Sequence, residues 1–237
     1  MQVQVISNVN EACSAKFCHK TAIVIDALRA TSTIATALAA GASSVKPVET
    51  VMEAREYYTE GDVLGGERFC RRITGFQLGN SPDEYVPQTV AGRRVILTTT
   101  NGTRAILKSL RAQEVIAAAF LNGGACAAYA ARQRRDIVMI CAGSHNEFAI
   151  EDGLCAGFLL HSLLEHCISD LKMDDFGAAM YSLYNDRKDA ICSTLFDSTT
   201  GRRLLKLGQS QDIEACSRRN LYHNVPIWRS GQLIDIS

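Results

Sequence analysis

Short apolar runs alternate with polar loops and helical patterns along the first two thirds of the chain. The apolar runs predict strands at residues 22–25, 44–48, 63–64, 94–97, 114–119 and 137–141. The helical patterns predict helices at residues 33–40, 50–59, 103–110, 124–134 and 151–166. Buried strands that alternate with helices are typical of βαβ units and of a mostly parallel sheet. The pattern therefore predicts an α/β fold with helices on both faces of the sheet.

The last quarter of the chain has a different pattern. Residues 174–220 are helical in pattern throughout, and two apolar runs at 225–228 and 233–236 flank a Ser-Gly turn. These two runs predict a short hairpin or an edge strand at the end of the chain. No Pro/Gly/Ser-rich linker divides the sequence, so we expect one domain over residues 1–237. Within it, residues 1–170 would carry the strand-loop-helix units and residues 171–237 a helical C-terminal part.

Composition excludes several classes of protein. The chain has 237 residues, with 25 Lys+Arg against 25 Asp+Glu, and no block of basic residues. This balance argues against nucleic acid or a membrane surface as a partner. The longest apolar stretch contains Asp26 and Arg29, and the N-terminal residues lack the cationic start of a signal peptide. Nine cysteines in a core-rich chain predict a cytoplasmic protein with mostly buried, reduced thiols.

Candidate chemistry lies in the loops that follow the predicted strands, because ligands of α/β sheets bind at this edge. Asp26 directly follows the first strand, Arg29 comes three residues later, and the hydroxyls of Thr31 and Ser32 lead into a helix. A helix N-terminus of this kind can bind an anion. The alternative is that Ser32 only caps the helix and Arg29 lies on the surface.

Two further loops follow at the third strand. Glu67 and Arg68 come after a pair of glycines, and they offer one metal or base ligand and one fork for phosphate. An ordinary turn with an exposed ion pair is the alternative. Asn80 lies in a Gly-Asn-Ser-Pro segment that is also compatible with a turn and a helix start.

The loop after the strand at 94–97 is the most informative. Thr100, Asn101, Gly102 and Thr103 follow a Val-Ile-Leu run, and Arg104 comes on the first helical turn. An Asn-Gly turn can gather backbone N–H groups into an anion-binding nest, to which Arg104 could reach back.

Two adjacent acids, Glu151 and Asp152, start the helix after the strand at 137–141. Acids at this position complement the helix dipole, but beside an anion site they also suit Mg²⁺, which binds carboxylates, water and a substrate's phosphate. His145 in the preceding loop is a candidate acid or base, although a single histidine in a loop is more often only solvated.

Together these loops resemble the 2-phosphosulfolactate phosphatase family. The resemblance rests on an ordered set of motifs: Asp-Ala-Leu-Arg-Ala-Thr-Ser-Thr at 26–33, Gly-Gly-Glu-Arg at 65–68, Gly-Phe at 75–76 with Gly-Asn-Ser-Pro at 79–82, Leu-Thr-Thr-Thr-Asn-Gly-Thr at 97–103, and Glu-Asp at 151–152 with Cys-Ala-Gly at 155–157. It implies a three-layer α/β/α fold and a Mg²⁺-dependent hydrolase that converts 2-phospho-3-sulfolactate to 3-sulfolactate, a step of coenzyme M biosynthesis in some organisms. The partner it implies is thus a small phosphorylated sulfonate. The segment Ser-Thr-Thr-Gly-Arg at 198–202 stands where an anion-binding loop is expected.

On this reading the residues have the following expected roles. The catalytic residues would be Asp26, Arg29, Glu67 and Arg68. The substrate would be bound by Thr31, Ser32, Asn80, Thr100, Asn101, Gly102, Thr103 and Arg104. The ligands of Mg²⁺ would come from Asp26, Glu67, Glu151 and Asp152. The attacking group is either a water activated by the metal or the Asp26 carboxylate.

Two other functions are compatible with the sequence. One is a Mg²⁺-dependent phosphatase for another small anionic organic phosphate, and the other is a non-catalytic protein that binds small anions. The apolar residues at 158–164 would form either core or the contact face of a homo-oligomer.

Overall fold

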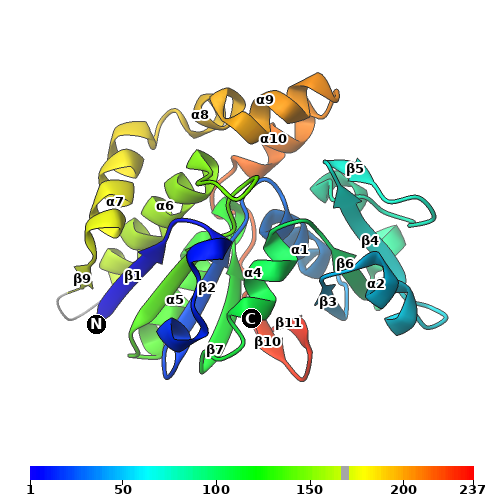
Figure 1. Ribbon diagram of the computed structural model, residues 1–237, viewed down its shortest axis with the longest axis horizontal. Helices are drawn as coiled ribbons and strands as arrows, with labels where there is room; N and C mark the ends of the chain where they lie inside the picture. The colour runs from blue at the N-terminus through cyan, green and yellow to red at the C-terminus, as the bar shows by residue number, and fades with distance from the viewer. Residues whose placement is uncertain (167–170) are drawn as a thin grey trace.

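A mostly parallel sheet runs through the whole molecule (Figure 1). The computed structural model describes residues 1–166 and 171–237. In these residues the sheet has 11 strands in the order β5-β4-β6-β3-β11-β10-β7-β2-β8-β1-β9. The strands are β1 (Gln2–Ile6), β2 (Thr21–Ile25), β3 (Ser44–Val48), β4 (Val63–Arg68), β5 (Arg71–Arg72), β6 (Arg94–Thr98), β7 (Glu114–Ala118), β8 (Ile137–Cys141), β9 (Lys172–Met173), β10 (Pro226–Arg229) and β11 (Gln232–Asp235).

The sheet consists of two parallel parts joined by an antiparallel hairpin. Strands β4, β6 and β3 form one parallel part. Strands β7, β2, β8, β1 and β9 form the other. Between them, β10 pairs with β7 and β11 pairs with β3, both antiparallel. The predicted hairpin is confirmed, but the alternative of an edge strand is wrong, because the hairpin fills the middle of the sheet.

Helices cover both faces of the sheet. They are α1 (Ala30–Ala39), α2 (Val51–Tyr57), α3 (Pro87–Val90), α4 (Gly102–Lys108), α5 (Gly123–Arg132), α6 (Ile150–His166), α7 (Asp175–Arg187), α8 (Ile191–Asp197), α9 (Thr199–Lys206) and α10 (Ser210–Cys216). The helices α7 to α10 account for the helical pattern predicted at 174–220.

Alternate side chains of the central strands point to opposite faces. In β2, Ile23 and Ile25 pack in the core formed with α5 and α6. Ala22 and Val24 belong to the core on the other face, with residues of α1 and α4. Because both faces of the sheet are covered, the strands are continuous hydrophobic runs in the sequence. Full burial of one isoleucine side chain contributes about 2–3 kcal/mol to the free energy of folding. The three-layer α/β/α fold is confirmed.

Two connections place the site. Helix α1 leads from β2 to β3, and α4 leads from β6 to β7, so each crosses from one parallel part of the sheet to the other. Both helices begin at the carboxyl edge of the strands. Loops from the two parallel parts therefore come together at this edge, where binding sites of α/β sheets lie.

One predicted loop is part of a strand. Gly65 and Gly66 pair with Leu97 and Thr98 of β6, so β4 continues to Arg68 instead of ending before the glycines. A side chain at Gly66 would overlap the carbonyl oxygen of Thr98. The glycine pair therefore serves close strand packing.

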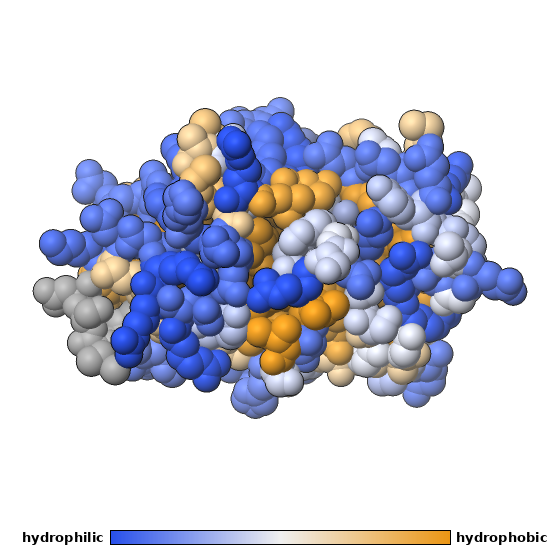
Figure 2. Space-filling view, turned by 90° about the horizontal axis from the view of Figure 1, so that it is seen from below, coloured by the Kyte–Doolittle hydropathy of each residue, from blue (hydrophilic) through white to orange (hydrophobic). Residues whose placement is uncertain are grey.

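The surface seen from the side of the N-terminus, opposite α8 to α10, carries mostly hydrophilic residues around a central apolar area (Figure 2). In the described residues no helix is both long and apolar enough to span a membrane. Most of the apolar stretch at 158–164 forms core, one of the two roles predicted for it. Its buried residues are Phe158, Leu159, Leu160 and Leu163.

The cysteines of the described residues are all free. Four are buried (Cys126, Cys141, Cys155 and Cys216), two are partly exposed (Cys70 and Cys192), and two are exposed (Cys13 and Cys18). Half of the described thiols are buried, so the prediction that most of them are buried is only partly confirmed. The remaining cysteine, at position 167, and the boundary predicted at residue 170 lie outside the described residues.

Candidate active site

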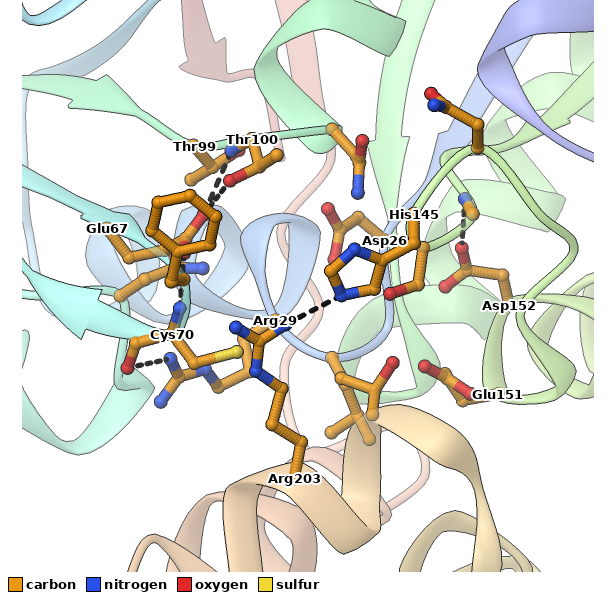
Figure 3. A pocket seen from close by; sticks show the side chains of 18 residues that line it. Asp26, Arg29, Glu67, Cys70, Thr99, Thr100, His145, Glu151, Asp152 and Arg203 are labelled. Atoms are coloured by element: carbon orange, nitrogen blue, oxygen red, sulfur yellow. Dashed lines mark hydrogen bonds between the residues drawn. The ribbon is translucent and has the colours of Figure 1, made fainter. Parts of the chain in front are cut away.

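A cavity of about 230 Å³ opens at the carboxyl edge of the sheet (Figure 3). Its walls come from the segments that follow β2, β4, β6 and β8, and from helix α9. Of the predicted site residues, the following line the cavity: Asp26, Arg29, Glu67, Asn80, Thr100, Asn101, Glu151 and Asp152. The fold therefore brings together segments that are far apart in the sequence: Ala27 and Asp152, for example, are 125 residues apart and share a hydrogen bond.

Three predicted substrate-binding hydroxyls do not line the cavity. Thr31 and Ser32 are buried in α1, and each donates to the carbonyl oxygen five residues earlier, at 2.9 and 2.8 Å. Thr103 donates to the carbonyl oxygen four residues earlier, at 3.0 Å. These hydroxyls fix the shape of the loops that carry the site.

Two predicted anion-binding arginines also lie elsewhere. Side chains alternate along β4, so Glu67 faces the cavity and Arg68 turns away from it. Arg68 donates to the Glu49 carbonyl oxygen at 2.8 Å and to the Thr98 hydroxyl at 2.9 Å. Arg104 is half-buried on α4 and does not line the cavity. Neither arginine lines the cavity, so their positions do not support the predicted contact with the substrate.

Asp26 lies at the N-terminus of α1, where its Oδ1 accepts a hydrogen bond from the Ala30 amide at 3.1 Å. The side chain is almost wholly buried. Burial, together with the charges of Glu67 and Glu151, raises the pKa of Asp26 to about 7. Gly102 at the start of α4 packs directly against this carboxylate: a Cβ there would lie 2.5 Å from Asp26 Oδ2. Gly102 thus shapes the site without lining the cavity.

Glu151 and Asp152 are both buried at the start of α6. Asp152 accepts the amide of Ala27 at 2.8 Å and that of Gly143 at 2.9 Å, one on each oxygen. Asp152 therefore joins the loop after β2 to the loop after β8. Burial raises the pKa of both carboxyl groups, and the charges of Asp26 and Glu151 raise that of Asp152 further.

Glu67 joins two other segments of the cavity wall. Its Oε1 accepts the amide of Thr100 at 2.9 Å and the hydroxyl of Thr100 at 2.8 Å. Its Oε2 accepts the amide of Cys70 at 2.7 Å, in the turn between β4 and β5. Because both of its oxygens accept hydrogen bonds, Glu67 connects the turn at Cys70 to the loop at Thr100.

Arg29 forms a buried ion pair with Asp212 of α10. The guanidinium also donates to Gln209 Oε1 at 3.0 Å, and Asp212 Oδ1 accepts the Ser81 hydroxyl at 2.6 Å. Asp212 was not predicted, because it lies in a helical stretch of the sequence without a motif. The pair fixes Arg29 at the cavity wall and attaches the C-terminal helices to it.

The buried pair leads to a prediction about stability. Asp212→Ala is expected to lower the free energy of unfolding by about 3–5 kcal/mol, because it leaves the Arg29 charge buried without a counterion. Urea unfolding measures this difference. In the exposed pair of Asp186 with Arg187, Asp186→Ala should change the value by less than about 1 kcal/mol. Equal small losses in both variants would contradict the structural role of Asp212.

Asn80 places an unpaired polar atom at the cavity wall. The residue lines the cavity and is buried, and its Oδ1 has no hydrogen-bond partner among the described residues. A buried polar atom without a partner costs about 1–3 kcal/mol. A hydrogen-bond donor that reaches this oxygen, such as a water molecule, would remove that cost.

Sequence reasoning missed several residues of the cavity wall. Thr200 and Arg203 come from α9, and Phe69 and Cys70 form the turn between β4 and β5. The hydroxyl of Thr200 lies close enough to Glu151 to oppose the burial that raises its pKa. The only signal was the Ser-Thr-Thr-Gly-Arg segment at 198–202, which was expected to bind an anion and does supply Thr200.

The donor set fits a hard divalent cation. Asp26, Glu151 and Asp152 are buried, and no ion pair of the described residues includes any of them. Buried carboxylates of like charge need compensation, and oxygen donors of this kind suit Mg²⁺. No three His, Cys, Asp or Glu side chains in the described part of the chain form a ready metal cluster. Mg²⁺ commonly binds through one or two carboxylates and completes its shell with water and substrate.

A cavity at the carboxyl edge of a parallel sheet, with buried carboxylates beside Asn and Thr side chains, defines an α/β enzyme site for a small anionic substrate. A family model described as 2-phosphosulpholactate phosphatase matches residues 7–231. The chain therefore belongs to the 2-phosphosulpholactate phosphatase family, which is a family of phosphatase enzymes.

Curated relatives are similar over nearly the whole chain. A protein of Thermotoga maritima named probable 2-phosphosulfolactate phosphatase is 41% identical over 224 residues, 94% of this chain and 94% of that protein. A protein of Caldanaerobacter subterraneus with the same name is 41% identical over 217 residues, 90% of this chain and 89% of that one. A third, from Clostridium acetobutylicum, is 35% identical and covers 99% of this chain and 100% of its own length.

Proposed function

We propose that this protein hydrolyses the phosphate monoester of 2-phospho-3-sulfolactate to 3-sulfolactate and inorganic phosphate, with Mg²⁺ as cofactor. The observation that carries the proposal is the group of buried carboxylates without basic partners, Asp26, Glu151 and Asp152, at the wall of a small polar cavity. Such a group binds a phosphate ester only when a cation lies between the two sets of negative charge. The names of the family and of its relatives support the substrate.

The carboxylates divide into two roles. Asp26 and Glu151 would hold the cation. Oδ2 of Asp26 accepts no hydrogen bond in the described residues, and the groups that favour a charged Glu151 are neutral donors: the hydroxyls of Thr200 and Ser198 and its own backbone amide. When bound, Mg²⁺ neutralises negative charge on the phosphate oxygens. Asp152 would position the loops that carry these ligands.

The neutral side chains would orient the substrate. Asn80, Thr100 and Asn101 line the cavity and offer amide and hydroxyl groups to anionic oxygens. Phosphoryl transfer has a loose transition state, so positioning and charge neutralisation supply most of the rate enhancement. Glu67 would serve this end indirectly, since it fixes Thr100 and the turn at Cys70.

In the reaction, the bond between phosphorus and the ester oxygen breaks, the leaving alkoxide takes a proton, and oxygen from water enters inorganic phosphate. Asp26 has two possible roles in this sequence. Its carboxylate attacks phosphorus and forms an acyl phosphate that water then hydrolyses, or it orients the water that attacks directly.

A phosphate-release assay tests the proposed function. With racemic 2-phospho-3-sulfolactate and Mg²⁺ we expect steady release of phosphate, its loss when EDTA removes the cation, and its return when excess Mg²⁺ is added. Release that persists in EDTA would contradict the cofactor. Release from other small organic phosphates but not from this one would contradict the substrate. Tight ligand binding without any release would indicate a non-catalytic anion-binding protein.

A further inference from the structure

Two arginines line the cavity, and they differ in their charge balance. Arg29 is buried and paired with Asp212, so its charge is largely compensated within the protein. Arg203 is half-buried, and no ion pair of residues 1–166 and 171–237 includes it. Its Nη1 instead lies 2.6 Å from Nε2 of His145 (Figure 3). Arg203 is therefore a cation of the cavity wall whose charge no carboxylate of the described residues pairs with, so its guanidinium can bind an anion.

Helix α9 aims Arg203 at the cavity. Ser198 caps the helix by accepting the amide of Gly201 at 2.9 Å. Thr200 and Arg203 are three residues apart, which places them on the same face of the helix, and both line the cavity. The neighbouring Arg202 is exposed and donates to the carbonyl oxygen of Asp197 instead. The two adjacent arginines thus have different surroundings.

His145 is held in place from the other side of the cavity. It lies in a tight turn in which Ser144 and Glu147 exchange two backbone hydrogen bonds, at 3.0 and 2.9 Å. His145 and Asn146 at the tip have φ angles of +52° and +67°, a left-handed conformation that non-glycine residues seldom adopt. Backbone strain of this kind concentrates at functional sites. Because a guanidinium has no acceptor, Nε2 of His145 accepts in this contact, and the ring orients Arg203.

Arg203 lies on the opposite side of His145 from Glu151 and Asp152. Figure 3 shows its side chain rising between Cys70 and His145, with Glu151 and Asp152 to the right of His145. Burial raises the pKa of the Cys70 thiol; the positive charges of Arg29 and Arg203 oppose that rise, and the negative charges of Glu67 and Asp26 add to it. The charge of Arg203 therefore lies near the turn between β4 and β5, as does that of Glu67. Glu151 and Asp152 thus mark a carboxylate end of the cavity. Arg203 marks a guanidinium end, where the Glu67 carboxylate already accepts hydrogen bonds from Thr100 and Cys70 on its two oxygens.

We propose that Arg203 binds the sulfonate of the substrate and that His145 positions its guanidinium, so that the site selects sulfonated phosphate esters. This inference rests on the proposed function and names the residues that give it specificity. The phosphate would lie at the carboxylate end, where a cation balances the charges, and the sulfonate would lie at the end that already has a cation. Of the N–H groups of Arg203, His145 takes one, and the rest form the fork that matches two oxygens of a sulfonate.

The test compares two substrates in matched variants. They are 2-phospho-3-sulfolactate and 2-phospholactate, which has hydrogen in place of the sulfonate. We expect Arg203→Met to lower kcat/KM for the sulfonated substrate about 10- to 100-fold, the range for one charge-assisted hydrogen-bonding group, mainly through a higher KM. For 2-phospholactate kcat/KM should change less than about 3-fold. Arg203→Lys should restore only part of the loss, because lysine lacks the fork. His145→Ala should show the same preference for one substrate to a smaller degree, and Arg202→Met should match the wild type.

The outcomes separate this inference from the proposed function. Wild-type protein that releases no phosphate from 2-phospho-3-sulfolactate overturns both. If the wild type is active and Arg203→Met retains its preference for the sulfonated substrate, the inference about Arg203 alone is overturned. An equal loss on both substrates likewise overturns it, because it would assign Arg203 to a group that both share, the phosphate or the carboxylate, or to folding. A loss confined to the sulfonated substrate, absent in Arg202→Met, supports it.

Discussion

Asp26→Asn is expected to lower kcat at least about 10²-fold, the scale of a positioned acid, base or charged group. Asparagine keeps the shape of the side chain and the hydrogen bond from the Ala30 amide to Oδ1. It removes the negative charge that either proposed role requires, attack on phosphorus or orientation of water with the cation. The measurement is steady-state phosphate release at saturating Mg²⁺.

The thermal stability of Asp26→Asn must be measured in parallel. Unlike kcat, it is not expected to fall. Asp26 is buried without a basic partner, so its neutral replacement removes a buried charge and should leave the thermal midpoint unchanged or higher in metal-free buffer. Glu151→Gln should also lose at least about 10²-fold in kcat. Asp186→Asn, an exposed acid on α7, serves as the control that changes neither. Near-wild-type kcat in both Asp26→Asn and Glu151→Gln would refute the assignment of the carboxylates.

A single-turnover reaction in ¹⁸O-labelled water then distinguishes the two roles of Asp26. If its carboxylate attacks phosphorus, hydrolysis of the acyl phosphate leaves the isotope in one of two places: in the carboxylate when water attacks the acyl carbon, or in phosphate when water attacks phosphorus. A trapped phosphoryl group on Asp26, or label in its carboxylate, therefore establishes covalent catalysis. Label in phosphate alone is compatible with either role, so trapping then decides: a phosphoryl group on Asp26 is expected only if its carboxylate attacks phosphorus.

The sequence predicted the edge of the sheet where the site lies for a simple reason. Polar residues directly after buried apolar runs must come out at the carboxyl ends of parallel strands. Asp26 and Asn101 follow such runs closely, whereas Asp152 comes after the loop that leads from β8 to α6; all three line the cavity. The order of strands was beyond this reasoning, because the central place of β10 and β11 depends on pairing with strands more than 100 residues away.

Side-chain direction accounts for the arginines that do not reach the cavity. Arg68 and Arg104 stand next to residues of the site in sequence, but neighbouring side chains of a strand face opposite ways and those of a helix diverge. Arg203 and Asp212 show the reverse case. They lie in helical stretches, and only the packing of α9 and α10 brings Arg203 to the cavity and Asp212 to Arg29. The first strand, β1, was missed although its Gln-Val-Gln-Val pattern alternates as an edge-side strand does.

Gly102→Ala is expected to lower kcat/KM about 10²-fold, although Gly102 does not line the cavity. The added Cβ would lie 2.5 Å from Asp26 Oδ2 and would also overlap the Cβ of Ala30. Both neighbours belong to the start of α1, so α1 and α4 must move apart and displace the carboxylate. A displacement of about 1 Å at a reacting group is enough for a loss of this size, and the overpacking should lower the free energy of unfolding by about 1–3 kcal/mol.

Gly61→Ala provides the matched control for this prediction. Gly61 has a φ of +99°, and a Cβ there would meet nothing within 4 Å. The variant should lower stability by about 1–2 kcal/mol through backbone strain alone and keep its full kcat/KM. Equal stability losses with activity lost only in Gly102→Ala would show that contact between α4 and Asp26 sets the geometry of the site. Full activity in Gly102→Ala would mean that the position of Asp26 does not depend on the close approach of these two helices, and that the junction between the two parallel parts of the sheet tolerates movement.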